Sequence, residues 1–392
     1  MTKNPVSVYV NFPFCDGCSF CTTVEYADVE SRIDNYVVAL VNEIKSSKAD
    51  GKVVHSVFLG DGAGLVPIKH LNSVMNAIKE NFTLSDKCEV TIELSPTSPH
   101  ITKLGKLQYM GINRISLQAV AIDDVVLGIL GKRFTVHRIR KALDNFKNYS
   151  FKVNVDLRVG VPIPKNLSDM KLRRSPEVEL ANLLTAYPQI EHVSLYEVEI
   201  EDGTDLAREL DYEQSFMQTV EDLVDDIILI HGVMEKFGLK QYDTWHWAKD
   251  GAYSIYNRSH LEIENECYAF GANAKGLIRD ERYENHEDID MYILAGEKVD
   301  YREKRTTLDK INEALINQLG TPNGVDLAGL RKLGLDILVE KQKQITELKS
   351  LKLIKATKNT LKMTKSGALL VNYALGELLF DEEEFKSLAS EA

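Results

Sequence analysis

The sequence predicts an α/β protein whose strands and helices alternate and form an open parallel sheet or a full or partial barrel. Short runs rich in Val, Ile, Phe and Tyr recur through the first two thirds of the chain, and amphipathic stretches of helical period separate them. Strands that alternate with helices are joined by right-handed crossovers and therefore lie parallel. With 392 residues, 44% of them hydrophobic and 27% charged, the chain is long enough for a large α/β domain with an appended unit.

These runs predict seven strands with helices between them. The strands comprise residues 7–12, 54–60, 88–94, 114–120, 152–161, 192–200 and 240–245. Apolar side chains spaced by three and four indicate the helices, as in the stripe Ile33, Tyr36, Val37, Leu40, Val41 and Ile44. Ligands of parallel α/β sheets and barrels bind at the carboxyl ends of the strands, so polar residues there are the first candidates for a site.

A different pattern begins near residue 300. Helical stretches at 308–319, 325–333 and 337–350 precede a hairpin at 353–363 and a final helix from Gly367. Helices followed by a two-stranded wing are typical of a small winged-helix unit. Such units often bind DNA, but the acidic chain favours packing or substrate covering as the role of this one.

The balance of charge argues against a nucleic-acid partner. Asp and Glu number 59 against 47 Lys and Arg, a formal charge of −12, whereas nucleic-acid binding relies on cationic side chains. No apolar run approaches the roughly 18 residues of a membrane helix, and the first residues lack the apolar core of a signal peptide. We therefore expect a cytoplasmic protein without a membrane partner.

Three of the five cysteines, Cys15, Cys18 and Cys21, lie within seven positions. In a reducing compartment such a group indicates metal or redox ligands rather than disulfides. Structural zinc takes four ligands, and no fourth Cys or His follows at short range. The CxxCxxC spacing is how a bacterial ferredoxin run begins. The pattern favours a 4Fe–4S cluster with one open iron, with zinc and unliganded thiols as the alternatives.

Further segments along the chain carry a family resemblance. In order, they are YVNFPFCDGCSFC, GDGAG, EVTIELSP, GINRISLQAV, NVDLRVGVP, HVSLYEVEIEDGTDL, GLKQYDTWHWAKDG and YAFGANAKG. Together they resemble the HemN/HemW family of radical S-adenosylmethionine (SAM) proteins, which contains anaerobic coproporphyrinogen dehydrogenases, heme chaperones and related methyltransferases. The resemblance runs from about Tyr9 to the C-terminal unit.

The resemblance implies a partial (β/α)6 TIM-like barrel of the radical SAM type with a small C-terminal helical or winged-helix-like domain. It divides the chain into a barrel core at 1–235, a barrel-extending, substrate-covering segment at 236–300 and a HemN-like unit at 301–392. In this family SAM chelates the open iron, and one electron cleaves it to methionine and a 5′-deoxyadenosyl radical. The resemblance therefore implies hydrogen abstraction or radical methyl transfer on an unidentified small-molecule substrate, with a flavodoxin or ferredoxin as electron donor.

The family's site residues map onto positions of this chain. Cys15, Cys18 and Cys21 match the cluster ligands, and Tyr9 matches the tyrosine beside the sulfonium, which completes the implied catalytic set. The other implied cofactor-binding positions are Phe20 near the adenine, Gly60, Asp61 and Gly62 in the glycine turn, Glu93 for the ammonium and Asp156 for the ribose.

Two of these motifs depart from the family pattern. The spacing between Cys15 and Cys18 is one residue shorter than the family's CxxxCxxC, so Cys15 could be displaced. The family's GGGTP turn reads GDGAG at 60–64, which loses a stiff Thr-Pro pair and gains a carboxylate.

Two positions that would contact SAM are also changed. Val120 stands where the family has the glutamine of its GVQ motif, although Gln118 lies on the same strand face. Lys132, with Arg133 beside it, stands where the family has the arginine for the SAM carboxylate. Lysine keeps the charge and loses the bidentate fork.

The heme-chaperone signature HNxxYW reads Tyr256-Asn257-Arg258-Ser259-His260-Leu261, so its heme-ligand histidine is absent, and His260 or Tyr256 could substitute. Trp245, His246 and Trp247 suggest an aromatic lining for a planar or apolar substrate, with core packing as the alternative. Two functions other than the radical SAM enzyme therefore stay open. One is a HemW-like heme chaperone, and the other is a catalytically silent relative that uses the barrel as a binding module.

Overall fold

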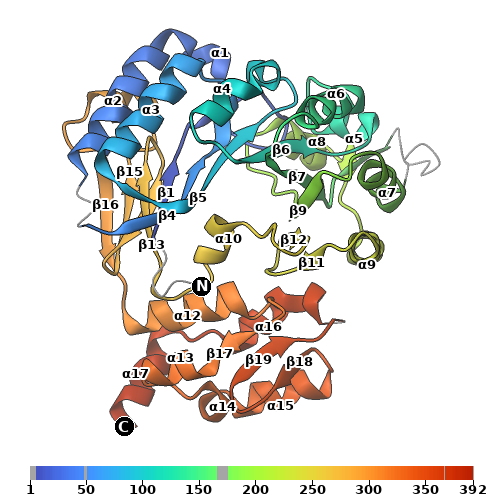
Figure 1. Cartoon of the computed structure of the whole chain (residues 1–392). Helices are drawn as coiled ribbons and strands as arrows, with labels where there is room; N and C mark the ends of the chain where they lie inside the picture. The colour runs from blue at the N-terminus through green and yellow to red at the C-terminus, as the bar shows by residue number, and fades with distance from the viewer. Residues whose placement is uncertain (1–5, 48–50, 166–174, 366, 392) are drawn as a thin grey trace.

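The computed structural model describes residues 6–47, 51–165, 175–365 and 367–391. Its main element is a 12-stranded sheet of order β11-β12-β9-β7-β6-β5-β4-β1-β13-β14-β15-β16. The central strands pair in parallel and comprise β9 (Ile190–Glu197), β7 (Lys152–Val159), β6 (Arg114–Val120), β5 (Thr83–Leu94), β4 (Val53–Leu59), β1 (Val6–Val10) and β13 (Glu266–Phe270). The order does not return on itself (Figure 1), so the predicted α/β fold with an open, partial barrel is confirmed.

Antiparallel strands extend the sheet at both edges. β11 (Lys240–Gln241) and β12 (His246–Ala248) follow β9, while β14 (Lys275–Ile278), β15 (Glu281–Asn285) and β16 (Val299–Lys304) follow β13. The single strand predicted at 240–245 is wrong, because a turn between β11 and β12 breaks it; in this turn Asp243 accepts the Trp245 amide at 2.8 Å. The sequence did not predict β14 to β16, because charged side chains occur along them and obscure the alternation of a half-buried strand.

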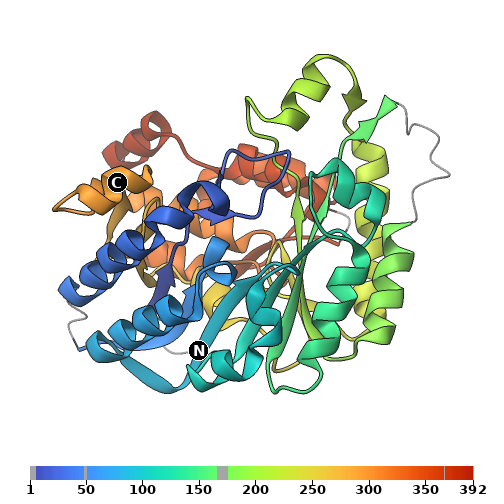
Figure 2. The same cartoon turned by 90° about the horizontal axis from the view of Figure 1, so that it is seen from above.

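Helices cover the outer face of the parallel strands (Figures 1 and 2). They comprise α2 (Ile33–Ser46), α3 (Ile68–Asn81), α4 (Leu104–Tyr109), α5 (Asp124–Ile129), α6 (Val136–Phe146), α7 (Pro176–Ala186) and α9 (Val220–Lys236). The stripe expected on the first of them is the buried face of α2, where Tyr36, Leu40 and Ile44 are at most 1% exposed. Each such side chain contributes about 1.5–3 kcal/mol by leaving water. None of the described helices has both the length and the hydropathy to cross a membrane.

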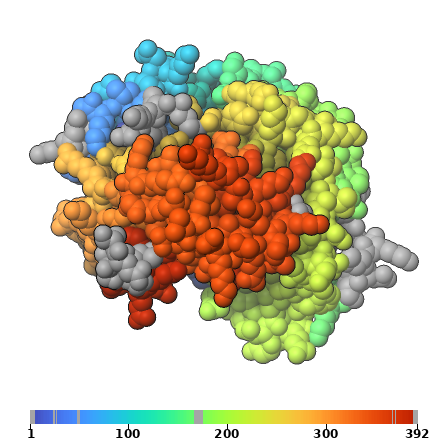
Figure 3. Space-filling model, turned by 90° about the horizontal axis from the view of Figure 1, so that it is seen from below, coloured from blue at the N-terminus to red at the C-terminus, as the bar shows by residue number. Residues whose placement is uncertain are grey.

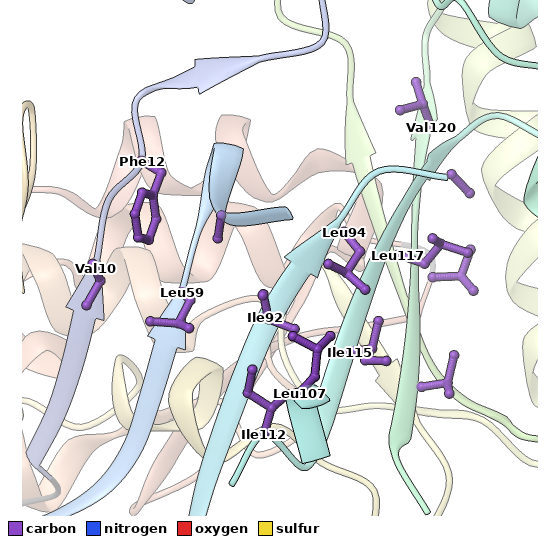
Figure 4. Packing of buried hydrophobic residues seen from close by; sticks show 14 of the residues in the cluster. Val10, Phe12, Leu59, Ile92, Leu94, Leu107, Ile112, Ile115, Leu117 and Val120 are labelled. Atoms are coloured by element: carbon purple, nitrogen blue, oxygen red, sulfur yellow. The ribbon is translucent and has the colours of Figure 1, made fainter. Parts of the chain in front are cut away.

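The main hydrophobic core lies between these helices and the sheet (Figure 4). Val10, Leu59, Ile92 and Ile115 occupy paired positions on β1, β4, β5 and β6 and have no exposed surface. Neighbouring residues on each strand point to opposite faces of the sheet. Because this apolar row faces the helices, the side chains next to it in sequence face the inside of the barrel. The register of the core therefore determines which residues reach the site.

The C-terminal residues form a separate unit with its own core. Its helices are α12 (Thr307–Gln318), α13 (Leu327–Lys332), α14 (Ile337–Glu340), α15 (Gln342–Ser350), α16 (Val371–Leu378) and α17 (Glu382–Glu391), and its sheet has the order β17 (Val325–Asp326), β19 (Thr360–Met363), β18 (Ile354–Ala356). Leu315, Leu330 and Leu361 are fully buried inside it. The predicted helices and hairpin are confirmed, and the unit covers the lower face of the molecule in Figure 3.

Two arginines join this unit to the rest of the protein. Arg305 is 5% exposed and pairs with Glu313 of α12 and with Asp280, both at 2.7 Å. Arg282 of β15 also pairs with Glu313. Since the carboxylate of Glu313 lies between two guanidinium groups, α12 is fixed against the edge of the sheet.

Candidate functional site

The three clustered cysteines lie on one loop, residues 13–23, which we call the cysteine loop. It contains the short strand β2 (Phe14–Cys15) and follows β1. Gly17 has φ 93°, a left-handed conformation that glycine adopts without strain, and its amide donates to Cys15 Sγ at 3.3 Å. The sulfurs of Cys18 and Cys21 are 2.7 Å apart. The shortened CxxCxxC spacing therefore still brings the three thiols together.

Side chains from two neighbouring segments hold the first half of the cysteine loop. The carboxylate of Asp16 accepts hydrogen bonds from Ser95 at 2.5 Å and from Thr97 at 2.7 Å, just beyond the end of β5. Lys132 donates to the Gly17 carbonyl at 3.2 Å and lies 4.0 Å from Asp16. Lys132 therefore contacts the cysteine loop.

The second half of the cysteine loop is held by the segments that follow α5 and β9. The Ser19 amide donates to the Leu130 carbonyl at 3.1 Å, and the Ser19 carbonyl accepts the Leu206 amide at 2.9 Å. Glu201 donates its amide to the Phe20 carbonyl at 3.0 Å and accepts the Thr22 amide at 2.7 Å through its carboxylate. The cysteine loop is therefore shaped by the protein itself.

The thiols of the cysteine loop share their protons unequally. Hydrogen bonds from Cys15 and Cys18 hold the pKa of the Cys21 thiol well below its ordinary value. Hydrogen bonds to Cys18 and Cys21 raise the pKa of Cys15. Thiolates are the ligands of iron–sulfur clusters and of zinc.

The donor set of the cysteine loop fits a 4Fe–4S cluster. Three thiols on one short loop, partly buried and with a backbone amide pointing at one sulfur, supply three of the four ligands that such a cluster takes. Among the described residues, no three Cys, His, Asp or Glu side chains are arranged to hold a single metal ion.

Carboxylates lie at the ends of β4 and β5, beside the cysteine loop. Glu93 accepts the Asp61 amide at 2.5 Å and the Gln118 side-chain amide at 3.4 Å. Burial, followed by the charges of Asp61 and Asp156, raises the pKa of Glu93 well above its ordinary value. Desolvation and the Cys21 sulfur raise the pKa of Asp61 to about 6. Two crowded acids favour a cationic ligand, because a cation would relieve their repulsion.

Gln118 reaches this acid pair because β6 is irregular at its end. The pairing of β6 with β7 shifts register between Leu117 and Val120, and Val120 has φ 66°. A β-branched residue in the left-handed region is strained, and such strain concentrates at functional sites. A bulge re-aims the neighbouring side chain. The structure therefore brings the side chain of Gln118 to Glu93.

Asp156 lies at the end of β7 in a polar network inside the barrel. Its two carboxylate oxygens accept from Ser116 at 2.5 Å and from Asn154 at 2.7 Å. The side-chain oxygen of Asn154 also accepts from Nδ1 of His192 at 2.5 Å. These partners fix the orientation of the carboxylate, as a hydrogen-bonding site for ribose hydroxyls requires.

The glycine turn is packed against aromatic side chains. A Cβ on Gly60 would lie 2.6 Å from the hydroxyl of Tyr9, and a Cβ on Gly62 would lie 2.3 Å from the ring of Phe14. These glycines are thus required by the close approach of the protein's own side chains. Tyr9 in turn donates to Asn11 at 3.0 Å, and burial raises its pKa well above the ordinary value.

Arg158 is a site residue that the sequence reasoning missed. Its guanidinium carbon lies 6.0 Å from the ring centroid of Phe20 and 5.1 Å from that of Tyr196. Arg158 follows Asp156 by two positions on β7 and so points to the same face, a signal that could have found it. Its charge also counters the raised pKa of Glu93.

Comparison with known proteins supports this arrangement. The model of the radical SAM superfamily matches residues 12–166. The heme chaperone HemW of Lactococcus lactis is 25% identical over 98% of this chain and 100% of its own, and that of Bacillus subtilis is 24% identical over 95% and 99%. The solved structure of HemN, the coproporphyrinogen III oxidase of Escherichia coli, superimposes with a TM-score of 0.78 at 18% identity over 96% of this chain and 90% of HemN.

The chain therefore resembles HemN/HemW-like radical SAM proteins over most of its length. The HemN likeness shows its fold, which is an α/β partial barrel with a mostly parallel sheet. The match to the radical SAM model covers the cysteine loop and the strands that carry Glu93, Gln118 and Asp156.

In this chain the residues at the heme-chaperone signature are half-buried, apart from the buried Ser259. Tyr256 lies on α10 (Ile255–Ser259), with its ring 4.7 Å from those of Phe58 and His260. Burial lowers the pKa of His260 to about 4. Of the aromatic residues predicted to line a substrate site, Trp247 packs at 3% exposure, whereas Trp245 is 42% exposed.

An open cleft of about 960 Å³ adjoins the cysteine loop. Thr22 and Asp61 belong to its lining, and its other side includes His286, Asp288 and Asp300. The cleft reaches Asp61 and is lined by more carboxylates than cations. Its electrostatic field therefore favours cationic molecules over anionic ones.

Proposed function

We propose that this protein binds a 4Fe–4S cluster and SAM at the ends of the parallel strands and that, like the proteins named heme chaperones, it binds heme. The observation that carries the proposal is the match to the Lactococcus lactis heme chaperone HemW over 98% of this chain and 100% of the relative. The match includes the C-terminal unit as well as the barrel.

The cysteine loop would hold the cluster. Cys15, Cys18 and Cys21 would be its ligands, and the bound group would supply the electron for reductive cleavage of SAM. The protein's part is to keep these sulfurs converged, which it does through Asp16 and Glu201 on the two halves of the loop. Arg133, beside Lys132, stays a sequence-based candidate for the SAM carboxylate.

The strand-end residues would bind SAM around that cluster. Glu93 and Asp61 would receive the ammonium group, because their raised pKa values fall again when a cation neutralises their repulsion. Asp156 would accept the ribose hydroxyls. Phe20, which is 8% exposed, would pack against the adenine.

Heme binding is tested by titrating the anaerobically reconstituted protein with hemin. We expect saturation at one heme per chain, with a Soret band distinct from that of free hemin. A featureless titration that continues beyond one equivalent would refute the heme proposal.

A radical SAM enzyme is the second candidate, and a specific observation favours it. Glu93, Gln118 and Asp156 converge beside the cysteine loop, which is the arrangement that SAM cleavage requires of its binding site. Reduction with dithionite, in place of a flavodoxin or ferredoxin donor, should then yield 5′-deoxyadenosine from SAM. A cluster-loaded protein that forms none would exclude the enzyme.

A catalytically silent binding module is distinguished from both by SAM affinity. Such a protein would retain the fold and bind SAM poorly even with iron and sulfide present. Calorimetric titration of the cluster-loaded protein with SAM separates these cases, because both other candidates require SAM to bind at the pair of acids Glu93 and Asp61.

A further inference from the structure

The turn that follows α5 packs directly onto the cysteine loop. The Ser19 hydroxyl donates to the Ile129 carbonyl at 2.8 Å, and the Ser19 amide donates to the Leu130 carbonyl at 3.1 Å. Gly131 has φ 70°, which glycine adopts without strain, and a Cβ on it would lie 2.8 Å from the Ser19 amide nitrogen. The backbone of this turn therefore lies against the cysteine loop, and the next residue is Lys132.

Lys132 is a largely buried cation beside the first half of the cysteine loop. Its side chain is 10% exposed, and its Nζ atom donates to the Gly17 carbonyl at 3.2 Å and lies 5.8 Å from the centroid of the Phe20 ring. The Gly17 amide in turn donates to Cys15 Sγ at 3.3 Å. One residue thus separates the ammonium group from a sulfur of the cysteine loop. Because little water surrounds this ammonium group, its charge acts strongly on charges near it.

Three other charged side chains lie near the cysteine loop. The carboxylate of Asp16 is 4.0 Å from Lys132 Nζ, and two hydroxyl groups donate the hydrogen bonds that it accepts. Glu201 accepts an amide of the second half of the loop. The guanidinium of Arg158 lies 6.0 Å from the Phe20 ring centroid and donates to a carbonyl of β9 at 3.2 Å. Lys132 differs from Arg158 because its side chain bonds the backbone of the cysteine loop itself.

We propose that Lys132 raises the reduction potential of the 4Fe–4S cluster and holds the cysteine loop in position; this inference rests on the proposed cluster binding. Reduction transfers one electron from an external donor to the cluster, where one ferric iron formally becomes ferrous and no bond breaks. The cluster and its thiolate ligands then carry one more negative charge. A cation beside them stabilises the reduced state more than the oxidised state, and local charge is one of the factors that set the potential of such clusters.

This role differs from the one that the family resemblance implies for Lys132. The resemblance places the SAM carboxylate at this position, where the family has an arginine. Arginine offers a carboxylate two parallel donors, whereas lysine is a compact point charge. The contacts of the Lys132 ammonium group are with Gly17, Asp16 and Phe20, all of which belong to the cysteine loop. The lysine charge is therefore directed to the cluster ligands.

The test is a redox titration of the reconstituted full-length protein without SAM, followed by electron paramagnetic resonance of the reduced cluster. Lys132→Met keeps a long side chain and removes its charge. Its reduction equilibrium should shift at least about tenfold toward the oxidised cluster, which lowers the potential by about 59 mV for one electron. Chelator should also remove iron from Lys132→Met faster than from the unaltered protein, because the loop loses its bond at Gly17. Lys132→Arg keeps the charge and should recover most of the potential.

The matched control is Lys45→Met, which removes the same charge at a distance from the cysteine loop. Lys45 lies in the last turn of α2, just before the amino end of β4, whereas the site lies at the carboxyl ends of the strands. Its side chain is 53% exposed and pairs with Glu80 at 3.8 Å. Solvent screens such a charge, so the potential of Lys45→Met should equal that of the unaltered protein. Melting curves should show that all the variants fold.

The outcomes separate this inference from the proposed function. If the unaltered protein takes up no iron and sulfide, the proposed cluster fails and this inference with it. If the cluster forms and Lys132→Met keeps the potential of the unaltered protein, the inference is wrong while cluster binding stands. A lysine that only bound the SAM carboxylate would give this result, because SAM is absent from the titration. The inference is also wrong if Lys45→Met lowers the potential as much as Lys132→Met does, since net charge alone would then explain the shift.

Discussion

Replacing Arg114 by methionine is expected to destabilise the protein by about 3–5 kcal/mol, the cost of breaking a buried ion pair from one side. Arg114 and Glu89 are 2% and 5% exposed, and the arginine Nε lies 2.9 Å from the carboxylate. The guanidinium also donates to the carbonyls of Ala252 at 2.6 Å and Tyr253 at 3.0 Å. The substitution leaves a buried charge without its partner and two carbonyls without this donor.

Replacing Glu89 as well should recover much of this loss. Methionine at both positions removes the two charges together and keeps an apolar side chain in place, which is often neutral for a buried pair. The remaining cost comes from the start of α10, because Glu89 accepts from the Ser254 hydroxyl and the Ile255 amide, both at 2.9 Å. Loss of such a cap costs about 1 kcal/mol, so the double variant should exceed Arg114→Met in stability by about 2–3 kcal/mol.

Urea unfolding followed by circular dichroism measures both effects, and the double-mutant cycle gives the coupling between the two positions. The slope of each transition should be unchanged, which shows that the same amount of surface is exposed. The reasoning is refuted if the free energy of unfolding of Arg114→Met is within about 1 kcal/mol of that of the unaltered protein, which is what an exposed ion pair contributes. It is equally refuted if the double variant is less stable than Arg114→Met.

Three further predictions concern the site. Replacing Cys15, Cys18 and Cys21 together by alanine should abolish bound iron and sulfide after reconstitution. Equal iron in the triple variant and the unaltered protein would overturn the cluster assignment. Glu93→Gln should weaken SAM binding about tenfold or more, because a charge-assisted hydrogen bond contributes about 1.5–3 kcal/mol. The pKa of Glu93 in the folded state is raised above the ordinary 4.5, so Glu93 stabilises the fold fully below pH 4.5 and loses this contribution as the pH rises. The free energy of unfolding should therefore fall less steeply above pH 4.5 in Glu93→Gln than in the unaltered protein. Asp16→Asn should leave the fold intact and speed cluster loss under chelator; unchanged loss would show that the bonds from Ser95 and Thr97 do not hold the loop.

Much of the site could be predicted from the sequence because the ligands of parallel sheets bind at the carboxyl ends of the strands. Glu93 and Asp156 each fall near the carboxyl end of a strand, and parallel strands bring those ends to one edge. The CxxCxxC spacing alone keeps three thiols on one loop. These features depend on the local sequence and on the two-residue alternation of the strands. The apolar side chains of the core make this alternation visible in the sequence.

Other parts of the site depend on contacts that no local pattern records. The packing of Gly60 against Tyr9 depends on how β1 and β4 pair. The position of Lys132 against the cysteine loop depends on where the segment after α5 turns. The hydrogen bonds that join His246 to Asp243 and Tyr196 require β12 to lie antiparallel beside β9, which the predicted single strand at 240–245 did not show.

The anchoring of the cysteine loop has a consequence for how the cofactor is acquired. Zinc fingers and similar small domains fold only around their metal, so their ligands converge when it arrives. Here hydrogen bonds of Asp16 and Glu201 tie the loop to segments that follow β5 and β9. Cluster insertion would thus be a late maturation step on a finished fold. An iron-starved cell would accumulate folded, cofactor-free protein that regains its cluster without refolding.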